Sequence, residues 1–89
     1  MTDFPRQVDG LAITTVQDGM VVHDHGCGRV HYLNHTAGLV LTLCNGKNSI
    51  QKIACLLQKQ FELTESPEEE VRETIQEFVE EDLVTVKAE

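Results

Sequence analysis

Residues 28–46 read Gly-Arg-Val-His-Tyr-Leu-Asn-His-Thr-Ala-Gly-Leu-Val-Leu-Thr-Leu-Cys-Asn-Gly, a pattern that predicts a strand leading directly into a helix. Residues 29–33 alternate between two faces, which is the period-two signal of a strand. Asn34 favours a helix start because its side-chain oxygen can accept hydrogen bonds from the first free amides. Apolar residues then recur at helical spacing as far as Cys44, and Gly46 is typical of a helix end. We therefore predict a strand over 29–33 and a helix over 35–44.

Two further strands are predicted before this segment. Residues 11–17 are rich in β-branched side chains, which favour a strand. The Asp18-Gly19 pair is a strong signal for a tight hairpin, so residues 20–24 should pair back on the first strand. Residues 1–10 show no periodicity and contain Pro5. We therefore expect a flexible N-terminal arm over 1–10, followed by one domain over 11–89.

Two further helices are predicted in the second half of the chain. The first of them begins after Asn48 or Ser49, and either side chain could cap it. The other has the pattern of a capping box, with Ser66 as the N-cap, Pro67 at the first helical position and Glu69 closing the box.

The predicted order of elements indicates the fold class. Asp82 marks the end of the last helix, and residues 83–86 form a short extended tail that could return to the sheet. Three strands followed by three short helices predict an α+β fold. Specifically, we expect a winged helix-turn-helix domain with an N-terminal three-stranded antiparallel sheet.

Charge and cysteine content narrow the classes of function. Residues 61–89 hold eleven of the fifteen acidic residues and two of the seven basic ones. Such a surface repels phosphate groups, so we expect neither nucleic acid nor an anionic membrane as a partner. The three cysteines form no CxxC motif, and no apolar run is long enough to cross a bilayer, so we expect a reduced, cytoplasmic location. A chain of 89 residues also has little room for a catalytic cleft, which favours a binding role.

From Tyr32 onward, the spacing of a set of residues resembles the coenzyme PQQ synthesis protein D (PqqD) family, whose members are peptide-recognition elements. The resemblance covers nearly the whole chain from Gly19, and the spacing of the set carries it rather than any single motif. The matching residues are Leu33-Asn34, Ala37, Val40-Leu41, Leu43, Asn45-Gly46, Ser49, Ile53-Ala54, Leu57, Phe61, Val71, Phe78 and Asp82-Leu83-Val84.

The resemblance implies a non-catalytic adaptor that works without a cofactor. Members of this family bind the leader segment of a ribosomally made precursor peptide and present it to a modifying enzyme, often a radical S-adenosylmethionine enzyme. The leader adds as a further strand to an edge strand of the sheet, and its side chains enter a groove beside the third helix. An exposed edge could also pair with a second copy, so a monomer or a weak homodimer is expected.

On this interpretation, the strand over 29–33 and the third helix form the two walls of the peptide-binding groove. Main-chain pairing along the strand would give affinity, and pockets for alternate side chains would give selectivity. Arg72 is a candidate partner for a leader carboxylate. The apolar residues of the helix could equally belong to the core. The predicted peptide-binding residues are Arg29, Val30, His31, Tyr32, Leu33, Val71, Arg72, Ile75 and Val79.

A cluster of histidines suggests a second possibility, a small metal-binding carrier. His23, His25, Cys27 and His31 lie close together in the sequence, and such side chains bind zinc or copper. Their spacing matches no established metal-binding pattern, so exposed histidines beside a free thiol are the alternative interpretation.

Two other functions remain as alternatives. A winged-helix DNA-binding regulator would place the third helix in the major groove, but that helix carries a series of glutamates against Arg72 alone. An enzyme acting alone is the weakest option. Cys27 could serve as a nucleophile beside a histidine, but the sequence shows no third group to orient the pair.

Overall fold

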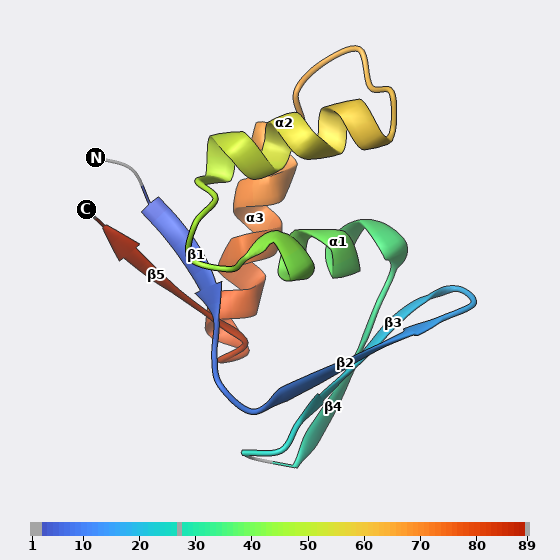
Figure 1. Ribbon diagram of the computed structural model, residues 1–89, viewed down its shortest axis with the longest axis vertical. Coiled ribbons are helices and arrows are strands. Elements are labelled where there is room, and N and C mark those ends of the chain that lie inside the picture. The colour runs from blue at the N-terminus through green and yellow to red at the C-terminus, as the bar shows by residue number, and fades with distance from the viewer. Residues whose placement is uncertain (1–2, 27, 89) are drawn as a thin grey trace.

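The computed structural model describes residues 3–26 and 28–88, which form five strands and three helices (Figure 1). Helix α1 packs on the inner face of a three-stranded sheet, and α3 packs against α1, α2 and β5. The ends of the described chain pair in a separate two-stranded sheet. The elements in chain order are β1 (Asp3–Gln7), β2 (Leu11–Val16), β3 (Gly19–Asp24), β4 (Arg29–Leu33), α1 (His35–Leu43), α2 (Ile50–Gln60), α3 (Glu68–Glu80) and β5 (Val84–Ala88).

The larger sheet is the predicted antiparallel meander, with strand order β2-β3-β4. Its hairpin pairs Val16 with Gly19, so the connection between β2 and β3 is a two-residue loop. β4 pairs with β3 from Asp24 opposite Arg29 to Met20 opposite Leu33. The bounds of all three strands agree with the predicted ranges to within one residue, because period-two patterning and a hairpin turn are local signals.

Local capping signals place the starts of the first two helices. The side chain of Asn34 accepts a hydrogen bond from the amide of Ala37 at 2.8 Å, as predicted. Of the two candidates for α2, Ser49 is the cap, since its hydroxyl accepts from the amide of Lys52 at 3.1 Å.

The predicted cap of α3 is wrong by one residue. Pro67, and not Ser66, is the N-cap, and its side chain makes no capping hydrogen bond. The ψ angle of 43° at Pro67 is not helical, so regular helix begins only at Glu68, and the carbonyl of Pro67 accepts the first helical bond from Val71. Glutamates at positions 68–70 favour this end because negative charge complements the helix dipole.

The end of α3 is a Schellman motif, which confirms Asp82 as the terminator. Asp82 has a left-handed φ of 61°. Its amide donates to the carbonyl of Val79 at 3.1 Å, and the amide of Leu83 donates to the carbonyl of Phe78 at 2.8 Å. This turn directs Leu83 into the core and sends the chain into β5.

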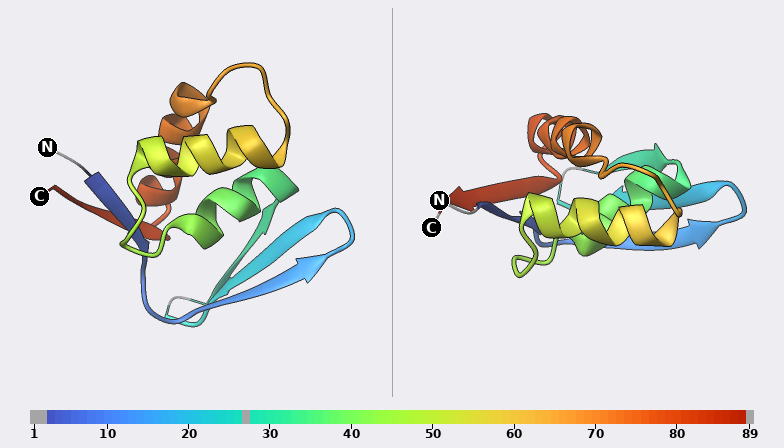
Figure 2. Two further views of the ribbon diagram at one scale, coloured as in Figure 1. Left: turned by 45° about the horizontal axis from the view of Figure 1, so that its top comes forward. Right: turned by 90° about the horizontal axis from the view of Figure 1, so that it is seen from above.

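The prediction of a flexible arm over residues 1–10 is wrong for the described part of that range. Asp3–Gln7 forms β1 and pairs antiparallel with β5, so the C-terminal tail does not join the larger sheet (Figure 2). Pro5 is buried, and its carbonyl accepts from the amide of Gly46 at 3.0 Å. Because these two strands are so distant in sequence, no local periodicity predicts that they pair.

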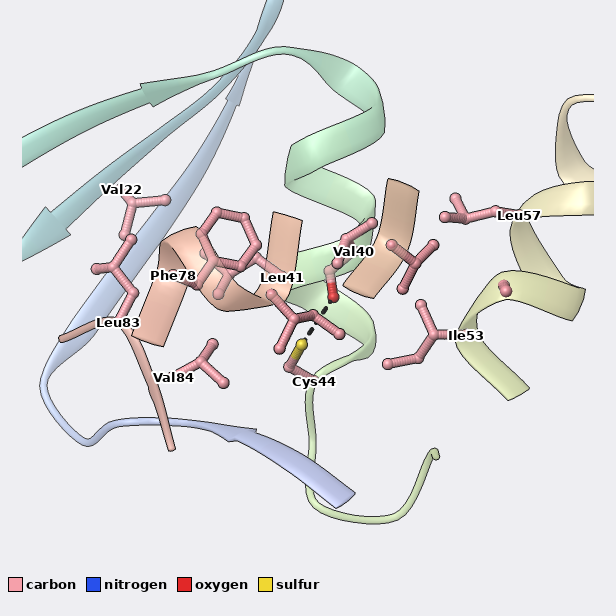
Figure 3. Packing of buried hydrophobic residues seen from close by; sticks show 12 residues of the cluster. Val22, Val40, Leu41, Cys44, Ile53, Leu57, Phe78, Leu83 and Val84 are labelled. Atoms are coloured by element: carbon pink, nitrogen blue, oxygen red, sulfur yellow. Dashed lines mark hydrogen bonds between the residues drawn. The ribbon is translucent and has the colours of Figure 1, made fainter. Parts of the chain in front are cut away.

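The core lies between the three helices, β5 and the inner face of the larger sheet (Figure 3). Each helix contributes an apolar stripe at helical spacing, and β3 contributes Val22. Such burial is the main stabilising term for a domain of this size. No described helix has both the length and the apolar character needed to cross a membrane. The buried apolar residues are Val22, Val40, Leu41, Cys44, Ile53, Ala54, Leu57, Val71, Ile75, Phe78, Leu83 and Val84.

Candidate functional site: an open strand edge beside a groove

β4 lies at one edge of the three-stranded sheet, and no strand within residues 3–26 and 28–88 pairs with its outer side. The candidate that could have covered it, the C-terminal strand, pairs with β1 instead. Unpaired amides and carbonyls on an exposed strand can bind another extended segment. β4 is held along its inner side by the pairing with β3, and its C-terminal end leads directly into the Asn34 cap of α1.

The strand register indicates which backbone groups of β4 face outward. The amide of His25 donates to the carbonyl of Gly10 at 3.0 Å, and hydrogen-bonded pairs alternate along an antiparallel ladder. The same alternation continues along β3 and into its pairing with β4. It places the amide and carbonyl of His31 on the side that faces β3. Val30 and Tyr32 therefore direct their amides and carbonyls to the open side.

A groove with a volume of about 540 Å³ runs beside this edge. β4 and the start of α1 form one wall, and α3 forms the other. The residues that line it are Val30, His31, Tyr32, Leu33, Asn34, Ala37, Thr74, Glu77, Phe78 and Glu81. The predicted location of a groove between this strand and the third helix therefore agrees with the structure.

The predicted β4 residues lie as expected, although their side chains divide between two faces. His31 and Leu33 are half-buried and face the helices, and successive side chains alternate across a strand. Val30 and Tyr32 therefore project from the opposite face, where 47% and 81% of their surfaces are exposed. Arg29 is exposed at the start of the strand and does not line the groove.

The residues predicted for the helix wall do not line the groove. Val71 and Ile75 are buried in the core, and Val79 is half-buried against it. Arg72 is largely exposed outside the groove, and its guanidinium lies 4.0 Å from the carboxylate of Glu68. The apolar stripe by which the sequence reveals a helix is the face that packs into the core. The face of α3 that borders the groove is therefore the one adjacent to this stripe.

That adjacent face carries the residues that the sequence-based prediction missed. Thr74, Glu77, Phe78 and Glu81 follow the i, i+3, i+4, i+7 spacing of one helix face. Its mixture of polar and apolar side chains gives no amphipathic signal of its own. Only the position of β4 relative to α3 shows that this face borders the open edge.

A contact between His31 and Glu81 joins the two walls of the groove. Nδ1 of His31 lies 3.0 Å from Oε2 of Glu81, which is within hydrogen-bonding distance. The His31 side chain is 14% exposed, and its Nε2 is buried with no hydrogen-bond partner in the described part of the chain. The contact holds the C-terminal end of α3 against β4.

The histidines proposed for metal binding do not converge. The rings of His23 and His25 lie 4.3 Å apart between centroids. His31 faces α3 from the other side of the sheet, and Cys27 lies outside the described residues. Within residues 3–26 and 28–88, no group of three or more histidine, cysteine or acidic side chains is placed to hold a metal ion.

Comparison with known proteins adds two findings. The family model described as coenzyme PQQ synthesis protein D (PqqD) matches residues 19–84, which span the larger sheet from β3 onward, all three helices and the start of β5. The fold is similar to that of a solved structure described as lasso peptide synthetase B1 complexed with the leader peptide, with a TM-score of 0.76 and 21% sequence identity. This similarity covers 92% of the present chain and 98% of the other. No curated protein sequence matches the chain significantly.

Proposed function

Because the chain belongs to the coenzyme PQQ synthesis protein D (PqqD) family, we propose that it is a non-catalytic adaptor for a ribosomally made precursor peptide. The leader of that peptide adds as a strand to the outer side of β4. The adaptor then presents the peptide to a modifying enzyme, which we infer to be a radical S-adenosylmethionine enzyme. The observation that carries the proposal is the open edge of β4 beside a groove that α3 borders.

Strand addition is physically suited to this edge. The outward amides and carbonyls of Val30 and Tyr32 can form main-chain hydrogen bonds with any extended peptide. The neighbouring groove can then accept alternate side chains of the same peptide and so distinguish one sequence from another. Because β4 is already held by β3 and α1, most of the ordering cost of binding falls on the peptide. An affinity on the order of micromolar would allow later release to the enzyme.

The similar solved structure is described as a complex with a leader peptide, which supports a peptide ligand for this fold. Its sequence identity of 21% gives no guide to individual contacts. The assignment of β4 and the groove as the binding site therefore rests on the geometry of the present chain.

Hydrogen exchange at single amides tests strand addition directly. In the free protein, the amides of Val30 and Tyr32 should exchange quickly, and those of His31 and Leu33 slowly, because only the second pair faces β3. Addition of the leader of the precursor encoded beside this chain should slow exchange at Val30 and Tyr32. Protection confined to residues outside β4 and α3 would contradict the proposed site.

A pair of proline variants separates loss of the binding edge from loss of structure. Val30→Pro removes an outward amide from β4, whereas Thr15→Pro removes an outward amide from β2, the opposite edge of the same sheet. We expect Val30→Pro to weaken leader binding by about tenfold, the effect of one lost hydrogen bond in the binding edge. Thr15→Pro should leave affinity unchanged. Equal losses in the two variants would indicate a general structural effect.

A further inference from the structure

We propose that the groove selects a leader segment that carries lysine or arginine two positions away from an apolar side chain. This inference rests on the proposed function, since it assumes that a peptide strand occupies the groove. It reverses the expectation drawn from the sequence, in which Arg72 would attract a leader carboxylate. In the structure Arg72 lies outside the groove, near Glu68.

The helix wall of the groove carries negative charge. Glu77 and Glu81 line the groove, and no lysine or arginine of the described chain is among its lining residues. They are four positions apart at the C-terminal end of α3, where Glu81 is the C-cap, so their side chains lie on the same face, where like charges repel. Both residues are exposed. A cation placed near them would relieve this repulsion and gain a charge-assisted hydrogen bond.

The contact with His31 gives the two glutamates different roles. Glu81 is held against β4 by its 3.0 Å contact with Nδ1 of His31. Glu77 has no such contact with a basic side chain within the described residues. Glu77 is therefore the principal acceptor for a cation of the peptide, with Glu81 adding to the negative potential at the end of the groove.

The apolar part of the groove indicates that the bound peptide carries an apolar side chain as well as the cation. Leu33, Ala37 and Phe78 form an apolar surface next to the two carboxylates. The helix wall from Thr74 to Glu81 extends about 10 Å, which is the length of about three residues of extended peptide. Two side chains of such a segment, two positions apart, face the same side. One fits the apolar surface, and the other reaches the carboxylates.

Selection from a library of random peptides tests this preference and does not require the leader itself. The probe is a displayed library of random dodecapeptides, which is selected separately on the wild-type protein and on Val30→Pro. Peptides recovered on the wild-type protein but not on the variant are counted as edge-dependent binders. Those binders should contain lysine or arginine about two- to fivefold more often than the unselected library, the range expected for exposed ion pairs. An apolar residue should lie two positions from the cation.

Two lysine variants provide the matched comparison. Glu77→Lys changes the charge inside the groove, whereas Glu69→Lys makes the same change on an exposed residue of α3 outside it. The cation preference should disappear on Glu77→Lys and persist on Glu69→Lys.

The possible outcomes distinguish this inference from the function on which it rests. Edge-dependent binders with no excess of lysine or arginine would overturn the charge selection alone. The charge selection would also be overturned if Glu69→Lys abolished the cation preference as fully as Glu77→Lys, because the total charge of the protein would then be the cause. Failure to recover any edge-dependent binder would overturn the proposed function, and the charge selection with it.

Discussion

At the scale of single residues, Cys44 is a buried thiol with a structural role. It is fully buried at the end of α1, and its Sγ donates to the carbonyl of Val40 at 3.1 Å (Figure 3). Burial raises the pKa of the Cys44 thiol to about 12, because the thiolate would lose its hydration in the core. This environment keeps the thiol protonated and unreactive at neutral pH.

The raised pKa of Cys44 predicts a loss of stability in alkali. The thiol ionises near its ordinary pKa of 9.0 in the unfolded chain but only near 12 in the folded protein. Its contribution is therefore fully present below pH 9 and is lost as the pH rises towards 12, by about 1.4 kcal/mol per pH unit at most.

Urea unfolding measured between pH 7 and 11 checks this prediction against Cys44→Ala. The variant should be less stable at pH 7, because the smaller side chain leaves a cavity. Its free energy of unfolding should then decline less steeply above pH 9 than that of the wild-type protein. Parallel declines would show that other groups cause the alkaline sensitivity.

At the scale of secondary-structure elements, the position of β4 depends on a close backbone contact with β3. Gly19 begins β3, and a Cβ atom there would overlap the carbonyl oxygen of Leu33 at the end of β4. Gly19 also has a φ of +154°. The absence of a side chain at Gly19 thus allows β4 to reach the cap of α1.

Replacement of this glycine should displace the candidate edge. We expect Gly19→Ala to lower the free energy of unfolding by about 2–4 kcal/mol, since the overlapping atom belongs to backbone that cannot rotate away. Gly28→Ala is the control: its φ of +71° is also left-handed, but no atom lies within 4 Å of the added Cβ. That variant should cost only about 1–2 kcal/mol. Similar losses in urea unfolding would show that backbone conformation alone is responsible.

At the scale of the whole molecule, β1 joins parts of the chain that are distant in sequence. It pairs with β5, and the amide of Gln7 donates to the carbonyl of Cys44 at 2.9 Å. The Gln7 side chain also donates to the carbonyl of Leu41 at 2.9 Å. The two ends of the described chain therefore lie side by side, on a different side of the helices from the larger sheet (Figure 2).

Removal of residues 1–7 should therefore destabilise the protein. The deletion removes the β1–β5 pairing, the buried Pro5 and the hydrogen bonds of Gln7. We expect a loss of at least about 3 kcal/mol, because each hydrogen bond contributes about 1 kcal/mol in addition to the apolar burial. Arg6→Ala changes only an exposed side chain of the same strand and should have little effect in thermal unfolding. An unchanged melting temperature in the deletion would support a flexible arm after all.

The sequence by itself determined the elements whose signals are local. The alternation over β4, the caps at Asn34 and Ser49, and the terminator at Asp82 each involve residues within one or two turns of one another. The likeness to the PqqD family was also visible in the spacing of the chain, and with it the expectation of a groove between β4 and α3.

Only the tertiary structure decided how those elements meet. β1 and β5 pair across nearly the full length of the chain, and neither strand alone shows which partner it will find. Likewise, the apolar stripe of α3 shows that one face is buried but not which neighbouring face borders β4. Packing places Glu77 and Glu81 there and leaves Arg72 outside, because the relative orientation of two elements depends on all the contacts of the core.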